Sequence, residues 1–196
     1  MGRRFRVITT ILFDFFDVIR VDPYKKWLDT NNYSREGYWY DIAAQYDRGM
    51  ISRTEFIAGL SKESAIHRDD IDAAFKGANI FDRDVIELIR TVQKTYKTGL
   101  LSNSGGPGLR SLLKEENLEE IFHEIIISGE VGFIKPERAI FEIALDRLDA
   151  VSGETIFIDD NPQNVEGANS VGIQGVLFTG YKKLTADLKD RGINWD

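Results

Sequence analysis

The sequence lacks cysteine altogether, and this absence excludes disulfide bonds, thiolate metal sites and a cysteine nucleophile. No apolar run approaches the roughly 20 residues that a membrane span needs. The apolar stretch 7–19 is interrupted by Asp14 and Asp17 and is followed by no small-residue cleavage site, so it is not a signal peptide. We therefore expect a cytoplasmic protein without a membrane partner.

Positive charge and histidine are also scarce. The chain has 25 lysines and arginines against 32 aspartates and glutamates, a net charge of −7, and its one dense basic cluster lies at residues 3–6. We interpret that cluster as a solvated tail, and the acidic balance argues against a nucleic-acid partner. His67 and His123 are the only histidines, and because neither lies near a motif, both are expected to be surface or structural residues.

The length and composition fit one core domain with a smaller insertion, because 42% of the 196 residues are hydrophobic and can form a packed core. We expect a monomer or a weak homodimer.

Five short apolar runs without alternation predict strands that are buried on both faces. These runs are residues 7–13, 98–102, 124–128, 155–159 and 174–178. Helical patterns separate the later runs, at residues 82–96, 109–117, 136–148, 162–171 and 184–191. This alternation predicts an α/β fold: a Rossmann-like three-layer core with a five-stranded parallel sheet.

Residues 20–95 contain no convincing strand and are interpreted as several helices separated by turns. We therefore predict a small α-helical cap domain at residues 19–95, including the returning helix, inserted into a core domain of residues 1–18 and 96–196.

Polar residues follow several of the predicted strands, where parallel sheets bind their ligands. Asp14 follows the first strand, and a buried carboxylate needs a cation. Ser102 and Asn103 end the second strand and precede a helix that begins near Pro107. A loop of this kind before a helix N-terminus suits a bound phosphate. Each feature alone is also compatible with an ordinary helix start or cap.

Lys135 precedes a predicted helix, where the helix dipole disfavours a cation unless an anion is near. Asp159 and Asp160 follow the fourth strand. Together with Asp14 they would concentrate negative charge if the strands are neighbours, and Mg²⁺ bound to carboxylates and a phosphate would neutralise it.

In the order and spacing of these motifs the sequence resembles the haloacid dehalogenase (HAD) superfamily, in the branch with a helical cap after the first strand. The fourth motif of that branch, Asp-Asp-x-x-x-Asn, is matched here by Asp159, Asp160 and Asn164. Segment 46–56 is similar to the cap of glucose-1-phosphatase-like proteins and of the N-terminal phosphatase domain of soluble epoxide hydrolases.

The resemblance implies a Mg²⁺-dependent phosphatase acting on a small phosphate monoester, with a sugar phosphate favoured. It implies that Asp14 is the nucleophile that forms an aspartyl-phosphate and that Ser102, Asn103 and Lys135 hold the phosphate. The implied Mg²⁺ ligands are Asp14, the backbone carbonyl of Phe16, Asp159 and Asp160, with Asp159 favoured for direct contact; Asn164 would brace the motif.

One position departs from the family pattern. Most phosphatases of the family carry a second aspartate two residues after the nucleophile as the general acid and base, whereas this chain has Phe16 there. Asp17, one residue later, is expected to point away from the site. Our hypothesis is a leaving group that needs little protonation, or a cap residue or water that takes over the proton transfer.

Three alternatives remain open. The first is a metal-independent 2-haloacid dehalogenase, which also lacks the second aspartate and needs no general acid. The second is a non-catalytic HAD-fold protein, which would bind its ligand without turnover. The third, a mutase, is disfavoured. In the cap, the aromatic residues are expected mostly to pack the cap's own core, although one or two are candidates to line the pocket. These residues are Tyr33, Tyr38, Trp39 and Tyr40.

Overall fold

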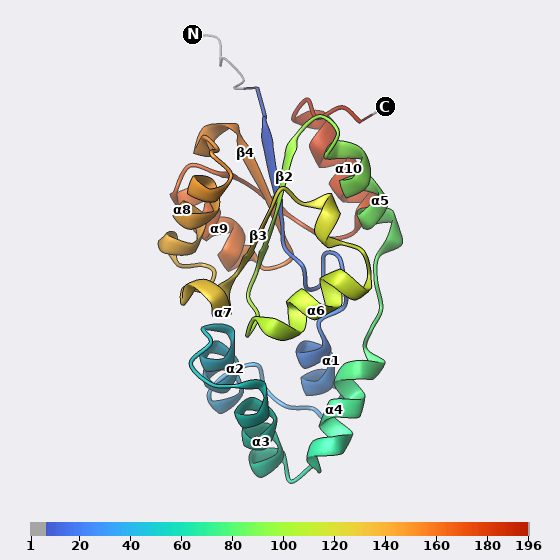
Figure 1. Ribbon diagram of the computed structural model, residues 1–196, viewed down its shortest axis with the longest axis vertical. Helices are drawn as coiled ribbons and strands as arrows, with labels where there is room; N and C mark the ends of the chain where they lie inside the picture. The colour runs from blue at the N-terminus through green and yellow to red at the C-terminus, as the bar shows by residue number, and fades with distance from the viewer. Residues whose placement is uncertain (1–6, 196) are drawn as a thin grey trace.

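The computed structural model describes residues 7–195, which form an α/β core and a helical cap (Figure 1). The strands are β1 (Thr10–Phe13), β2 (Lys97–Ser102), β3 (Glu124–Ile127), β4 (Thr155–Asp159) and β5 (Gln174–Leu177). They form a five-stranded sheet in the order β3-β2-β1-β4-β5 with every neighbouring pair parallel. The predicted sheet is confirmed, and the central strand β1 lies between β2 and β4.

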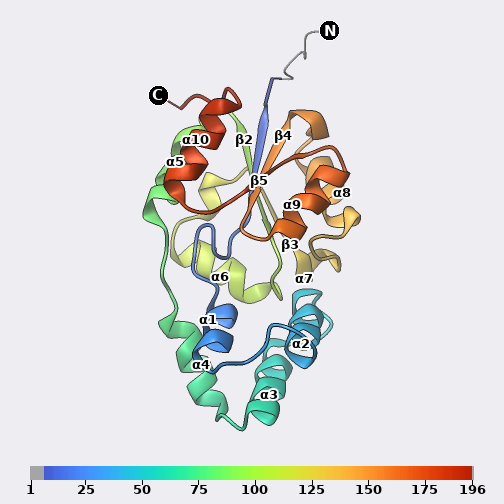
Figure 2. The same cartoon turned by 180° about the vertical axis from the view of Figure 1, so that it is seen from behind.

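Helices cover both faces of this sheet, as Figure 2 shows from behind. The helices of the core are α5 (Arg83–Val92), α6 (Pro107–Glu115), α7 (Ser128–Val131), α8 (Arg138–Arg147), α9 (Pro162–Ser170) and α10 (Tyr181–Asp190). Ile11 and Phe13 of β1 pack in one cluster with α5, α6 and α10, whereas Leu12 packs in a second cluster with α8 and α9. Successive strand residues thus enter opposite cores, and the predicted three-layer arrangement is confirmed.

The strand and helix boundaries differ from the predicted ones at several positions. The apolar run starts at residue 7, but the first strand begins at Thr10. Val7 is 78% exposed and therefore does not belong to the buried strand. The short helix α7 was not predicted, since four residues carry no periodicity. The helix predicted from residue 136 begins at Arg138.

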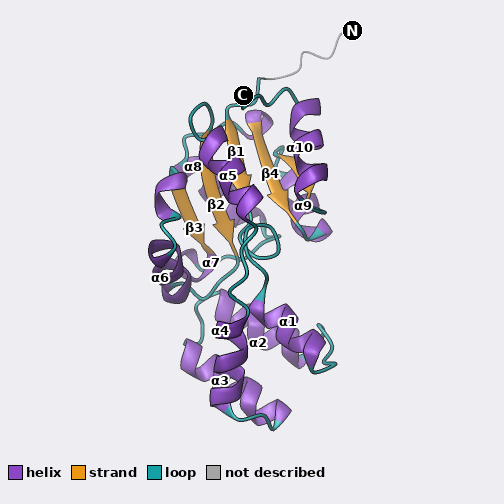
Figure 3. Ribbon diagram, turned by 90° about the vertical axis from the view of Figure 1, so that its right-hand side faces the viewer, coloured by secondary structure: helices purple, strands orange, loops and turns teal. Residues whose placement is uncertain are grey.

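The cap consists of α1 (Pro23–Thr30), α2 (Tyr38–Asp47), α3 (Arg53–Ser64) and α4 (Arg68–Gly77), which lie beyond the carboxyl end of β1 (Figure 3). These helices share a small core that includes Trp27, Phe56 and Leu60. Ser52 and Glu55 form a capping box at the start of α3, and His67 caps α4. His67 is therefore structural, as is His123, whose Nδ1 accepts a hydrogen bond from the backbone N–H of Thr98 at 3.0 Å.

Helix α5, which the sequence analysis grouped with the cap, buries Val85, Ile89 and Val92 in the core cluster of β1. Its packing favours placing α5 with the core, because its apolar face meets the sheet and not the cap helices; the domain bounds themselves stay a prediction. The basic cluster at residues 3–6 lies outside the described residues. Within residues 7–195, no helix is both long and apolar enough to cross a membrane.

Candidate active site

Three charged side chains from separate segments meet at the carboxyl end of the sheet. The Lys135 ammonium lies 2.6 Å from Oδ1 of Asp14 and 2.7 Å from Oδ2 of Asp159. Asp14 directly continues β1, and its backbone N–H donates to the carbonyl of Ile158 at 2.8 Å, which places Asp14 beside the end of β4. The strand register therefore brings together residues that are separated by more than 100 positions in the sequence.

The trio is almost inaccessible to water, with side-chain exposures of 7% for Asp14, 0% for Asp159 and 1% for Lys135. Burial raises the pKa of the Asp14 carboxyl to about 8; Asp159 adds to this rise, and Lys135 opposes it. Burial alone would lower the pKa of Lys135, but Asp14 and Asp159 outweigh that effect and hold it above its ordinary value. Each charge is therefore stabilised by its oppositely charged neighbour.

The side chain of Asn103 fixes the backbone of Lys135. Its Oδ1 accepts from the Lys135 N–H at 2.8 Å, and its Nδ2 donates to the Lys135 carbonyl at 3.1 Å. Both ends of the amide are thus engaged with Lys135. Phosphate binding by Asn103 stays a prediction, and these bonds favour a different role, which is to position the lysine.

Asp159 is held by four hydrogen bonds. Its Oδ1 accepts from the Asn161 N–H at 2.8 Å and from the Asn164 amide at 3.1 Å, and its Oδ2 accepts from Asn164 at 3.1 Å and from Lys135 at 2.7 Å. Asn164 thus lies where the expected bracing requires it. Because both oxygens of Asp159 are engaged, the bonds do not favour the direct metal contact expected of Asp159.

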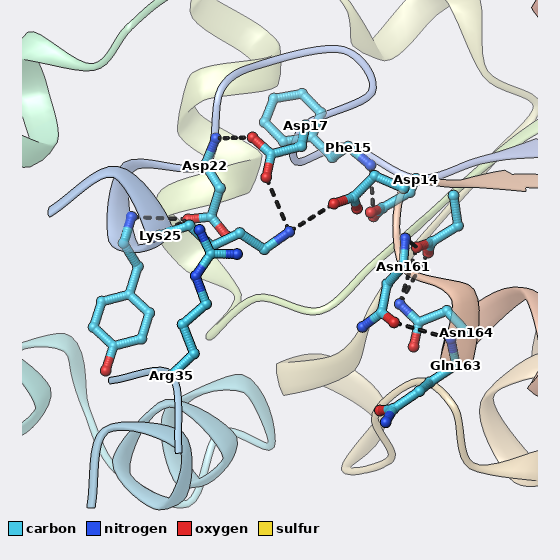
Figure 4. Close-up of polar contacts among 12 residues, drawn as sticks. Asp14, Phe15, Asp17, Asp22, Lys25, Arg35, Asn161, Gln163 and Asn164 are labelled. Atoms are coloured by element: carbon cyan, nitrogen blue, oxygen red, sulfur yellow. Dashed lines mark hydrogen bonds and ion pairs between the residues drawn. The ribbon is translucent and has the colours of Figure 1, made fainter. Parts of the chain in front are cut away.

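Asp160 is the freer carboxylate, and it reaches toward the cap. Its Oδ2 lies 2.8 Å from the ammonium of Lys25 in α1, which is also 2.9 Å from Oδ2 of Asp17 (Figure 4). Asp17 has a φ of +58°, and its Oδ1 accepts from the Asp22 N–H at 2.8 Å. Asp17 therefore shapes the loop between β1 and α1, and, contrary to the expectation that it points away from the site, it shares Lys25 with Asp160. That it does not replace the missing aspartate stays a prediction.

The donor atoms and the charge of this cluster fit a divalent cation. Carboxylate oxygens of Asp14, Asp159 and Asp160 lie within 4.8 Å of one another. With Asp17 they make four carboxylates against the two ammonium groups of Lys25 and Lys135, which leaves a net charge of −2. Oxygen ligands and this net charge are what Mg²⁺ requires.

A buried hydroxyl without a partner lies at the end of the neighbouring strand. Ser102 closes β2, is fully buried, and its Oγ makes no hydrogen bond within the described part of the chain. A buried polar atom of this kind costs free energy unless a ligand or water engages it. A phosphoryl oxygen would satisfy it.

A cavity of about 460 Å³ lies between the core loops and the cap. Phe16, Asn103 and Ser104 line it from the core. Its remaining wall is mixed: charged and polar side chains alternate with aromatic and aliphatic ones, which include Tyr24, Tyr46, Phe56, Phe75, Leu109 and Leu112.

The cap aromatics singled out from the sequence do not line this cavity. Tyr33 and Trp39 pack against the cap core, and Tyr38 and Tyr40 are 41% and 57% exposed. Two of the four thus pack in the cap core, which is fewer than the majority expected, and the prediction that one or two line the pocket is wrong for this cavity.

Asp47, a cavity-lining carboxylate at the end of α2, was not predicted from the sequence. A signal for it was present, because a carboxylate in the last turn of a helix is disfavoured by the helix dipole and indicates another role.

The comparisons with known proteins agree with this architecture. Residues 8–172 match the family model of the haloacid dehalogenase-like hydrolases, and the chain belongs to that family. Among solved structures, a HAD family enzyme from Bacteroides thetaiotaomicron has a TM-score of 0.74 at 23% identity, over 93% of this chain and 99% of that one. The same enzyme in complex with magnesium and inorganic phosphate has a TM-score of 0.71, covering 90% and 98%. At these identities the likeness shows the fold.

Two curated fungal relatives match about 70% of this chain. A drimenol cyclase from Aspergillus calidoustus is 28% identical over 145 residues, which is 70% of this chain and 28% of the cyclase. A sesquiterpene phosphatase from Aspergillus oryzae is 27% identical over 139 residues, covering 69% of this chain and 71% of the phosphatase. The chain thus spans about a quarter of the cyclase's length but most of the phosphatase's.

Proposed function

We propose that this protein is a Mg²⁺-dependent phosphatase that hydrolyses a small phosphate monoester through an aspartyl-phosphate on Asp14. The observation that carries the proposal is the buried Asp14–Lys135 pair beside an acidic cluster whose oxygens suit a divalent cation. The unpartnered hydroxyl of Ser102 supports a phosphate as the bound group. The magnesium and phosphate bound to the Bacteroides enzyme support the same reading.

In this mechanism Asp14 attacks phosphorus, the ester oxygen leaves, and water then cleaves the acyl-phosphate bond to regenerate the carboxylate. Lys135 and Ser102 hold the phosphoryl oxygens, and Lys135 opposes the rise in the pKa of Asp14 that burial causes, which favours the ionised nucleophile. Mg²⁺, held by Asp14, Asp160 and the carbonyl of Phe16, with Asp159 behind it, would offset the phosphoryl charge. Asn103 keeps Lys135 in place through both ends of its amide.

For the organic part of the substrate, the cavity wall favours a ring or an apolar chain. Tyr24, Tyr46, Phe56 and Phe75 offer aromatic faces, which suit apolar groups and also stack on sugars. The similarity to a sesquiterpene phosphatase supports an apolar alcohol. We therefore place apolar and aryl phosphates beside the sugar phosphates expected from the sequence, and a panel of both classes would rank them by kcat/KM.

The first test is hydrolysis of p-nitrophenyl phosphate with Mg²⁺, with EDTA and in Asp14→Asn. Its aryl leaving group needs little protonation, so the absence of an aspartate at position 16 does not hide activity. We expect turnover that EDTA and Asp14→Asn both abolish. A folded wild-type protein without turnover that still binds phosphate or Mg²⁺ would instead support a non-catalytic binding protein.

A dehalogenase is the second candidate, and Phe16 is the residue that favours it. An (S)-2-haloacid dehalogenase from a Pseudomonas strain is 32% identical over 88 residues, which cover 45% of this chain. The cluster of Asp14, Asp159 and Asp160 argues against it, since the dehalogenases that the sequence resembles use no metal. Release of chloride from a 2-chloro acid in the presence of EDTA would decide in its favour.

A further inference from the structure

Asp47 is the last residue of the cap helix α2, and its carboxyl lines the same cavity as Phe16 and Asn103. Within residues 7–195 this carboxyl makes no hydrogen bond or ion pair. Asp22, the other carboxylate of the cap side, is engaged, since it accepts from the N–H groups of Tyr24 and Lys25 as the cap of α1. Asp47 is thus an uncommitted carboxylate that faces the cavity.

The backbone of Asp47 is bound to the loop that carries the phosphate-binding residues. Ser128 Oγ donates to the Asp47 carbonyl at 2.5 Å and accepts from the N–H of Ser104 at 2.8 Å. Gly49 has a φ of +71°, and a Cβ there would lie 2.6 Å from the carbonyl oxygen of Gly129, so only glycine permits this approach. Through Ser128, the end of α2 is therefore fixed to the core at Ser104, the residue that follows Asn103.

The surroundings of Asp47 suit proton transfer near neutral pH. Burial raises its pKa to about 7; the charge of Asp22 adds to the rise, and Lys135 opposes it. The other charged groups of the cavity wall are Arg20 in the loop before α1, Arg53 of α3, Lys76 of α4 and Glu115 of α6.

We infer that Asp47 is the general acid and base of this phosphatase, in place of the carboxylate that position 16 lacks. The inference rests on the proposed function. In the first step the Asp14 oxygen–phosphorus bond forms, the phosphorus–ester oxygen bond breaks, and the proton of Asp47 passes to the departing oxygen. In the second step Asp47 takes a proton from water as the water oxygen attacks phosphorus and Asp14 is released.

The test compares two substrates of similar shape, benzyl phosphate and p-nitrophenyl phosphate. The benzyl alkoxide needs protonation on leaving, whereas p-nitrophenolate does not. Asp47→Asn should lower kcat/KM for benzyl phosphate by about 10²–10⁴ and leave kcat/KM for p-nitrophenyl phosphate nearly unchanged. Asp47→Glu should restore part of the loss, and Asp41→Asn, which removes an exposed carboxylate from the same helix, should behave as wild type.

Two further readouts separate proton transfer from a structural role. In Asp47→Asn the second step lacks its base, so p-nitrophenol should appear in a burst equal to the enzyme concentration, followed by slow turnover. In the wild type, kcat/KM for benzyl phosphate should fall as the pH rises through about 7, because only protonated Asp47 donates. That decline should be absent in Asp47→Asn.

The outcomes also separate this inference from the proposed function. If Asp47→Asn has the wild-type substrate ratio, no burst and the wild-type pH profile, the inference is overturned and the phosphatase stands. Equal losses on both substrates with a lowered thermal midpoint indicate a structural role and also overturn it. A wild type that hydrolyses neither ester, in folded protein with Mg²⁺, overturns both.

Discussion

Replacing Lys135 by methionine removes the one ammonium group that separates two buried carboxylates. Lys135 lies 2.6 Å from Asp14 and 2.7 Å from Asp159, and all three side chains are at most 7% exposed. In the variant, Asp159 keeps its bonds to Asn161 and Asn164, whereas Asp14 keeps only the N–H of Phe15. Removing one partner of a buried ion pair costs about 3–5 kcal/mol. For a chain of this size that loss lowers the thermal midpoint by roughly 6–20 °C.

The pH dependence of this loss tests the cause. Without the ammonium, the pKa of Asp14 in the folded protein, already raised to about 8, rises further above its unfolded value of about 4. The penalty is therefore larger at pH 9 than at pH 7, because wild-type Asp14 ionises beside the ammonium as the pH rises through about 8, whereas Asp14 of the variant stays neutral in the folded state. Thermal and urea unfolding in EDTA at both pH values would measure it.

Two controls and one outcome make the prediction refutable. Lys25→Met removes an ammonium that pairs with both Asp17 and Asp160, and because these three side chains are 23–31% exposed, the change should cost at most about 1 kcal/mol. The double variant Asp14→Asn with Lys135→Met should recover much of the stability, since the uncompensated charge is gone. A Lys135→Met loss below about 1 kcal/mol, or one that is equal at pH 7 and pH 9, would refute the electrostatic account.

Three further predictions test the site by other means. Ser102→Ala should leave unfolding free energy unchanged or raise it by up to about 1 kcal/mol, yet weaken inhibition by inorganic phosphate roughly 10–100-fold, because the hydroxyl is unpartnered until ligand binds. Asp160→Asn should abolish the rise in thermal midpoint that Mg²⁺ produces, while Asp17→Asn, which also loses an ion pair to Lys25, should keep it. Arg48→Ala and Glu137→Ala should each raise KM by up to about fivefold, and combining them should add little, because they remove the same partly exposed cap–core ion pair.

The sheet could be predicted from the sequence because buried parallel strands are continuous β-branched runs. The end-of-strand positions of Asp14, Ser102 and Asp159 then followed from the same runs. The β3-β2-β1-β4-β5 order of the strands places the three residues at one edge. The positions of these residues at the carboxyl ends of the strands were therefore predictable, because the direction of the backbone determines them.

Side-chain orientation was less predictable. The sequence places Asn103 in the loop after β2, but it does not show that the amide turns to the backbone of Lys135, 32 positions later. In the cap, short helices pack on several sides at once, so periodicity does not distinguish the cavity wall from the cap core. Tyr46 and Phe56 line the cavity, whereas Tyr33 and Trp39 stack on each other in the cap, with ring centroids 4.5 Å apart.

Locating the acid and base on the cap has a mechanistic consequence. An aspartate two residues after Asp14 would belong to the core, so its place in the site would not depend on where the cap lies. Asp47 belongs to α2, and the Ser128 contact with its carbonyl holds it at the cavity only while the cap is docked. With Asp47 as acid and base, leaving-group protonation and water activation both require the docked cap, so the chemistry is confined to the closed cavity, where bulk water competes least with the substrate.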